Sequence, residues 1–134
     1  MKLNNIVFSS PNSKEIRVID FGISGLYIGS NPEKSLAGSL KYMAPEVLTG
    51  KNTSADPALD IFSMGCILFA LVTGQLPFDG EISTVRENII NGKYSYPSDI
   101  SLSESLIDLI DGMLKVNPRR RITMVGILDH PWLE

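Results

Sequence analysis

The sequence has little of what several protein classes require: one cysteine, one histidine, and a net charge of only -3 at pH 7. A single cysteine, Cys66, excludes an intramolecular disulfide framework and is typical of a reducing compartment. Twelve Lys and Arg against 15 Asp and Glu argue against a broad basic surface for nucleic acid. The most apolar run, 61–72, is broken by Ser63 and Gly65 and is shorter than the roughly 20 residues that cross a bilayer. We therefore expect an intracellular, cytoplasmic protein without nucleic-acid or membrane partners.

The N-terminal part of the sequence predicts a β-hairpin. Residues 5–9 and 15–19 have strand composition, and Ser10-Pro11-Asn12-Ser13 between them is typical of a turn. Antiparallel pairing brings the start of the first strand beside the end of the second. We therefore expect Asn5 and Asp20 at the same end of the hairpin.

The rest of the sequence predicts one long loop and then helices. Glycine and serine dominate 21–40, and such loops are usually functional when they occur. A helix is predicted from Asp56-Pro57 to about Thr73, where Gly74 ends it, and its apolar residues on all sides indicate full burial. Further helices are expected with Ser83, Ser103 and Thr123 as N-caps.

Several short motifs follow one another in a fixed order along this chain. They are Asp20-Phe21-Gly22, Ala44-Pro45-Glu46, Asp60-Ile61-Phe62-Ser63-Met64-Gly65, Gly74-Gln75-Leu76-Pro77-Phe78, Asn117-Pro118-Arg119-Arg120-Arg121-Ile122-Thr123 and His130-Pro131-Trp132. In this order the sequence resembles the serine/threonine branch of the protein kinase family, nearest the calmodulin-dependent and AMP-activated kinase groups. The resemblance implies a mainly α fold with a short β-hairpin, which is the C-terminal lobe of the protein-kinase-like fold in truncated form.

The first residues match only the end of the catalytic loop of that family. Lys2 falls on the lysine of the loop and Asn5 on its asparagine, while Met1 falls one place after the catalytic aspartate. The resemblance thus predicts that residues 1–134 are a partial kinase domain, from the end of the catalytic loop to the final helix, without the small lobe. We expect the isolated chain to be inactive.

The resemblance implies that Asn5 and Asp20 hold magnesium and that Lys2 contacts the γ-phosphate of ATP. Mg²⁺ prefers oxygen ligands, which a carboxylate and an amide supply. The alternatives are an Asx turn at each strand end and, for Lys2, a solvated chain terminus. The intact parent would transfer phosphoryl from Mg-ATP to serine or threonine of a protein substrate. The alternative function is a non-catalytic, kinase-like scaffold or binding module.

The family also suggests roles for two serines of the long loop. Residues 38–42 resemble the segment that receives the substrate residue beyond the phosphorylated one, with Ser39 at the usual threonine position. Ser35 occupies the place of an activating phosphorylation, where added negative charge could order the loop. The alternative is an ordinary loop serine.

Three further residues have implied structural roles. Glu46 and Arg121 would form a buried ion pair that ties the long loop to the final helices. Asp60 would accept backbone hydrogen bonds from the catalytic loop. Because the helix that precedes this loop in the family is missing, we expect exposed apolar surface on 57–73, with marginal stability or self-association.

Overall fold

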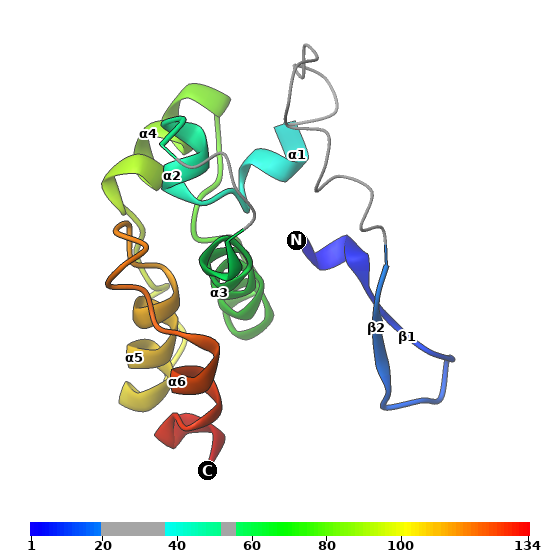
Figure 1. Cartoon of the computed structure of the whole chain (residues 1–134). Helices are drawn as coiled ribbons and strands as arrows, with labels where there is room; N and C mark the ends of the chain where they lie inside the picture. Colours follow the sequence, from blue (N-terminus) through cyan, green and yellow to red (C-terminus); the bar gives the residue numbers. More distant parts are fainter. Residues whose placement is uncertain (20–36, 52–55) are drawn as a thin grey trace.

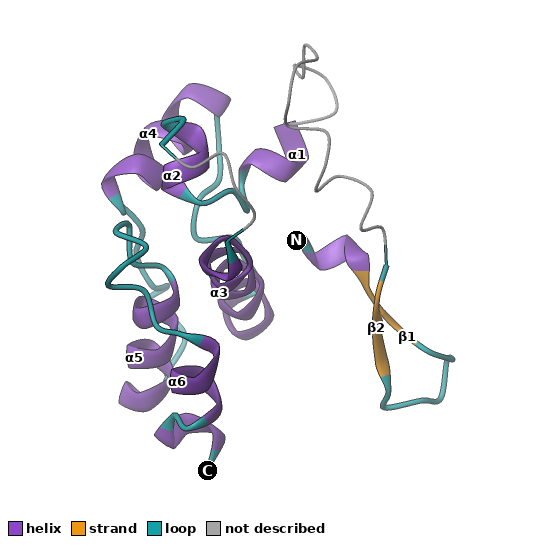
Figure 2. Ribbon diagram, viewed as in Figure 1, coloured by secondary structure: helices purple, strands orange, loops and turns teal. Residues whose placement is uncertain are grey.

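The computed structural model describes residues 1–19, 37–51 and 56–134. A hairpin and a group of helices lie on opposite sides of the long helix α3, and the chain begins close to α3 (Figure 1). In the described part, strands occur only in the hairpin (Figure 2), so the predicted mainly α fold with a short β-hairpin is confirmed. The elements are η1 (Leu3–Asn5), β1 (Ile6–Phe8), β2 (Ile16–Val18), α1 (Ala37–Leu40), α2 (Pro45–Leu48), α3 (Pro57–Thr73), α4 (Ile82–Asn91), α5 (Glu104–Met113), α6 (Met124–Leu128) and η3 (Pro131–Leu133).

The hairpin pairs β1 with β2 in antiparallel register, with Ile6 opposite Val18 and Phe8 opposite Ile16. Both strands are shorter than the predicted 5–9 and 15–19. Asn5 lies in the 3-10 turn η1 and not in the strand, because its amide N–H donates to the carbonyl of Lys2 (3.0 Å) and closes that turn. Asparagine readily adopts such turns.

Most helices begin or end at the residues that the sequence predicted as caps. The side chain of Asp56 accepts from the amide of Ala58, that of Ser103 from Leu106, and that of Thr123 from Gly126. Gly74 ends α3 in the left-handed conformation, with φ of 78°, which glycine adopts without a steric penalty. These three caps and this helix end were predicted correctly.

Two sequence predictions of local structure were wrong. Ser83 is not an N-cap, because α4 begins at Ile82 and Glu81 occupies the cap position without a side-chain hydrogen bond. The C-terminal end of the predicted loop 21–40 is helical at Ala37–Leu40, where α1 packs against α4. The rest of that loop, 21–36, lies outside the described residues.

These caps lead to a stability prediction. Replacing Ser103 with alanine removes the side-chain acceptor of the Leu106 amide and should cost about 0.5–2 kcal/mol. Ser83→Ala, at a position that caps nothing, should change the free energy of unfolding by less than about 0.5 kcal/mol. Urea unfolding of both variants measures the difference, and equal losses would contradict the assignment of the caps.

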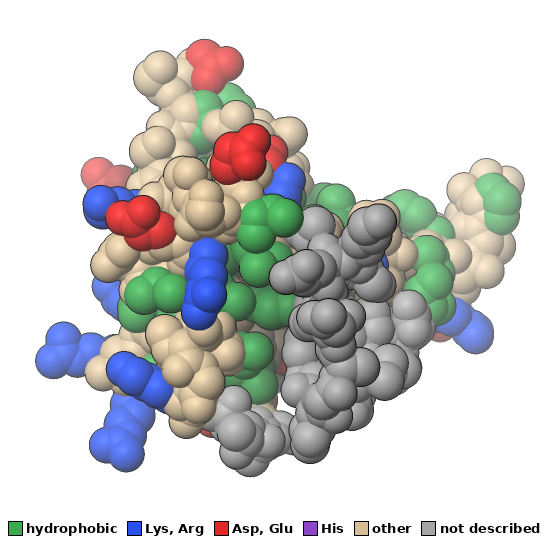
Figure 3. Space-filling model, turned by 90° about the horizontal axis from the view of Figure 1, so that it is seen from above, with side chains coloured by type: hydrophobic (Ala, Val, Ile, Leu, Met, Phe, Trp, Pro, Cys, Tyr) green, Lys and Arg blue, Asp and Glu red, His purple; other side chains and the backbone are tan. Residues whose placement is uncertain are grey.

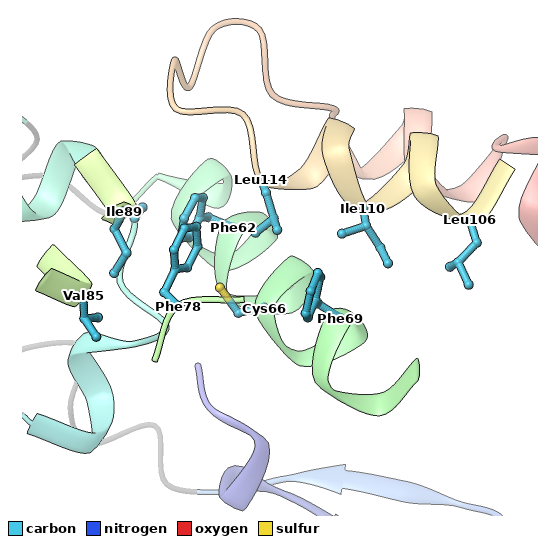
Figure 4. Close-up of a cluster of buried hydrophobic side chains, with 10 residues drawn as sticks. Phe62, Cys66, Phe69, Phe78, Val85, Ile89, Leu106, Ile110 and Leu114 are labelled. Carbon is cyan, nitrogen blue, oxygen red and sulfur yellow. The ribbon is translucent and has the colours of Figure 1, made fainter. Parts of the chain in front are cut away.

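The main hydrophobic core lies between α3, α4 and α5. Phe62, Cys66 and Phe69 of α3 face Ile110 and Leu114, in and just after α5, and the α4 side (Figure 4). At Gly65 the backbones come so close that a Cβ would lie 2.9 Å from both Leu114 Cδ2 and Met113 Cβ. Burial of these side chains is the main favourable contribution to folding.

Helix α3 is not buried on all sides, contrary to the prediction from its composition. Leu71 is 66% exposed, and Met64 and Leu68 are partly exposed on the same side. The expected apolar surface on this helix is therefore present. No helix in 1–19, 37–51 or 56–134 is long and apolar enough to cross a membrane.

Candidate functional site

The start of the chain places Lys2 and Asn5 next to the end of the hairpin. Lys2 precedes η1 and is partly buried, whereas Asn5 is buried, with 9% of its surface exposed. The amide N–H of Ile19 donates to the carbonyl of Asn5 (2.7 Å). Since Asp20 follows Ile19 directly, the chain continues toward Asp20 from a point beside Asn5. Asp20 itself lies outside the described residues, so its pairing with Asn5 stays a prediction.

Tyr42 connects this region with α3, and sequence reasoning missed it. Its carbonyl accepts a hydrogen bond from Ser63 Oγ (2.8 Å). Burial raises the pKa of its hydroxyl, partly opposed by a hydrogen bond with the backbone of Leu3. Tyr42 thereby joins η1, α3 and the segment after α1. No local signal in the sequence predicts these contacts, because Leu3 and Ser63 are distant from Tyr42 along the chain.

Ser39 and Lys41 lie in the segment expected to receive a substrate. Ser39 is partly buried in α1, and its carbonyl accepts from the amide of Tyr42 (3.1 Å). Lys41 forms an ion pair with Asp79, and its hydrogen bond is the main cause of the lowered pKa of the Asp79 carboxyl. The predicted phosphorylation site, Ser35, lies outside the described residues.

Glu46 and Arg121 meet in a bidentate, buried ion pair. The two contacts are 2.7 Å from Nη1 to Oε1 and 3.0 Å from Nη2 to Oε2. The same guanidinium donates to the carbonyls of Ala58 and Lys115 and lies over the ring of Phe62, 5.1 Å from its centroid. The pair thus connects α2 with the start of α3 and with the segment after α5. This is the arrangement implied by the family resemblance.

Asp60 is exposed in the first turn of α3. Its Oδ1 lies 4.0 Å from the amino group of Met1. The side chain therefore faces the start of the chain, where the match to the catalytic loop begins. The role expected for Asp60, accepting backbone hydrogen bonds from that loop, stays a prediction.

The surroundings of the single cysteine and the single histidine favour a structural role for both. Burial raises the pKa of the Cys66 thiol strongly, which disfavours a reactive thiolate. His130 Nε2 lies 3.2 Å from Asp108 Oδ2, and its Nδ1 accepts from the amide of Trp132 (3.3 Å). Both ring nitrogens of His130 thus have partners that hold the C-terminal turn.

Two tyrosine hydroxyls share one carboxylate on the far side of the core. Tyr94 and Tyr96 donate to Asp111 Oδ1 at 2.6 and 2.7 Å. Burial, together with this hydrogen bond to Asp111, raises the pKa of both hydroxyls well above the usual value. They therefore remain protonated donors at neutral pH and tie the segment after α4 to α5.

The face seen from above carries charges of both signs. Lys and Arg side chains lie near Asp and Glu side chains around a strip of hydrophobic ones (Figure 3). The described residues of this face therefore do not carry charge of a single sign.

Comparison with known proteins identifies the family. The family model described as "Protein kinase domain" matches residues 1–133. The probable serine/threonine-protein kinase MARK-A of Dictyostelium discoideum is 40% identical over 122 residues, which are 90% of this chain and 11% of that protein. The serine/threonine-protein kinase SIK1 of Mus musculus is 36% identical over 135 aligned positions, covering all of this chain and 17% of that protein.

A plant relative agrees with these two. The SNF1-related protein kinase catalytic subunit alpha KIN12 of Arabidopsis thaliana is 41% identical over 133 residues, 98% of this chain and 26% of that protein. The matched residues therefore cover 90% or more of this chain but only 11% to 26% of the length of these relatives. On this agreement between sequence motifs, fold and relatives, the chain belongs to the protein kinase family, as its motifs predicted.

Proposed function

We propose that the parent protein is a serine/threonine kinase and that this chain supplies its magnesium-binding and substrate-binding part. The main support is the hydrogen bond from the Ile19 amide to the Asn5 carbonyl, because it brings the strand that leads to Asp20 beside Asn5. The relatives named above are serine/threonine kinases. Residues 1–134 would form one partial kinase domain in a cytoplasmic protein.

Asn5 and Asp20 fit a magnesium ion by the chemistry of their donor atoms, an amide oxygen and a carboxylate. Magnesium neutralises charge on the phosphates of ATP when bound. The burial of Asn5 restricts its side chain, so that the amide is held in place without substrate. Lys2, partly buried at the start of η1, would bring its ammonium group to the γ-phosphate.

The segment from Ser39 to Tyr42 would hold the protein substrate. Its backbone turn, the contacts of Tyr42 and the Lys41–Asp79 ion pair fix the position of this segment against α3 and α4. In the reaction the γ-phosphorus–oxygen bond to ADP breaks and a bond to the substrate hydroxyl oxygen forms. The hydroxyl proton passes to the family's catalytic aspartate, which the 134 residues do not include. Phosphorylation of Ser35 would activate the enzyme by ordering the loop.

A complementation experiment tests this proposal. The chain alone and the chain joined to the upstream half of the mouse SIK1 kinase domain are assayed for phosphate transfer to a serine peptide. We expect no transfer by the chain alone, and transfer by the chimera that falls at least about 100-fold in Asp20→Asn, because the metal loses a charged ligand. Asp99→Asn, at an exposed position in the loop before α5, is the control and should keep full activity.

Two outcomes would contradict the proposed function, and a third would contradict the expected inactivity of the chain alone. Unchanged activity of the chimera carrying Asp20→Asn would remove the magnesium role of Asp20. A folded chimera that binds ATP but transfers no phosphate would favour the non-catalytic scaffold. Mutation-sensitive transfer by the pure chain would overturn the expectation that it is inactive by itself.

A further inference from the structure

A pocket of about 570 Å³ lies where α2, the start of α3 and the segment that leads into α6 meet. Its volume is within the roughly 300–1,000 Å³ of pockets that hold small molecules. The buried ion pair of Glu46 and Arg121 forms part of its wall. Because this pair joins α2 to the segment after α5, it holds together walls that are distant in the sequence.

One part of the pocket wall is apolar. It consists of Pro57 and Ile61 from α3, Met124 from α6, and Pro118 and Ile122 from the segment before α6. Ile61 is 4% exposed and Met124 is 44% exposed, so this surface extends from the core to the solvent. The apolar body of a ligand would remove it from water, which is favourable.

The two carboxylates of the wall already have partners. Glu46 accepts both hydrogen bonds of the bidentate pair with Arg121, so these two charges neutralise each other. Asp56 accepts a hydrogen bond from the amide of Ala58 (2.9 Å) and thereby caps α3. Neither carboxylate therefore needs a bound cation.

Two cationic side chains of the wall, on Lys51 and Arg119, differ in this respect. Both are exposed, and in the described part of the chain no carboxylate lies within ion-pair distance of either. Asn52-Thr53-Ser54-Ala55, which follows Lys51, contains no acidic residue. With three basic and two acidic side chains, the wall has a formal charge of +1 on a chain of net charge -3. The pocket is therefore a local positive site on an acidic protein.

We propose that this pocket binds a small organic acid with an apolar body. The carboxylate lies between Lys51 and Arg119, where a guanidinium can donate two parallel hydrogen bonds and an ammonium adds a second positive charge. The body of the acid covers Ile61 and Ile122. An inorganic anion would leave this apolar wall in water, and a neutral apolar molecule would leave the two cations unpaired.

The methyl group of Met124 reports on occupancy of the pocket in nuclear magnetic resonance. The chain has five methionines, of which Met124 lines the pocket and Met64 and Met113 do not. The probe is 1-naphthaleneacetate, a carboxylate on a rigid apolar body. We expect a saturable shift of the Met124 methyl signal, with Met64 and Met113 unchanged, and weaker binding with added salt.

Two matched compounds separate the contributions of charge and apolar surface. The neutral 1-naphthaleneacetamide keeps the body and lacks the charge, whereas acetate keeps the charge and lacks the body. We expect each to bind at least about tenfold more weakly than 1-naphthaleneacetate, because each loses one of the two interactions.

A matched pair of double variants locates the binding site. Lys51→Gln/Arg119→Gln removes both cations of the pocket wall and should weaken binding of 1-naphthaleneacetate at least about tenfold. Lys115→Gln/Arg120→Gln removes the same two charges from exposed residues that do not line the pocket, and should change binding by less than about twofold. Circular dichroism checks that both variants keep the helix content of the original chain.

Three outcomes would overturn the proposal: no shift of the Met124 signal, equal binding of 1-naphthaleneacetate and its carboxamide, or equal effects of the two double variants. None of them bears on phosphate transfer, because the complementation assay measures that separately. Failure of the proposed kinase function would likewise leave this titration unaffected.

Discussion

Glu46→Ala should lower the free energy of unfolding by about 3–5 kcal/mol, because it leaves the Arg121 guanidinium charged and buried without its carboxylate. Only 1% of the Arg121 side chain and 6% of the Glu46 side chain are exposed, so the charge left on Arg121 is poorly hydrated. The carbonyls of Ala58 and Lys115 still accept from Arg121, but they do not neutralise its charge. Urea unfolding followed by circular dichroism measures the loss.

The ion pair between Lys41 and Asp79 provides the control. It is exposed, so Asp79→Ala should cost less than about 1 kcal/mol. If Glu46→Ala has no folded baseline, Glu46→Gln keeps an oxygen acceptor and should give an intermediate loss. A loss for Glu46→Ala no larger than that for Asp79→Ala would show that the buried pair does not hold α2 to the C-terminal segment.

Phe62→Ala should cost about 3–5 kcal/mol, since it removes a fully buried ring from the centre of the core. The ring stacks on Phe78 with a centroid separation of 6.0 Å and lies under the Arg121 guanidinium. The cavity would therefore weaken contacts of α3 with the loop before α4 and with the Glu46 ion pair. Urea unfolding followed by circular dichroism measures this loss as well.

Phe8→Ala is the matched control for this substitution. Phe8 is 65% exposed on the hairpin, so its removal should change the free energy of unfolding by less than about 0.5 kcal/mol. Similar losses for the two phenylalanines would mean that the core does not centre on α3. The double variant Phe62→Ala/Glu46→Ala should lose less than the sum of the single losses, because both side chains contact Arg121.

Much of the local structure could be predicted from short stretches of sequence. Asp56, Ser103 and Thr123 were assigned as caps because a cap side chain bonds to an amide only two or three residues away. Ser83 was misassigned, since serine also fits inside the first turn of a helix and the start of α4 depends on its packing against α1 and α2. The helical turn α1 was missed for the same reason: four residues carry too little local preference to form a helix alone.

The candidate site could be predicted only in part. The hairpin register follows from alternation and a turn, and it brings Ile19 against Asn5. The pairing of Lys41 with Asp79 and the position of Tyr42 had no local signal, because their partners lie in segments that are distant in sequence. The family resemblance supplied the Glu46–Arg121 pair, which joins residues 75 positions apart.

The sequence by itself determined the protein kinase family, the hairpin and most helix ends, because these depend on ordered motifs and on contacts within one turn. Only the tertiary structure shows which face of α3 stays exposed in the described part of the chain. Composition made α3 apolar on every side, but burial depends on which other elements pack against each face. Leu71 is exposed and Met64 and Leu68 are partly exposed because the described elements cover only part of that helix.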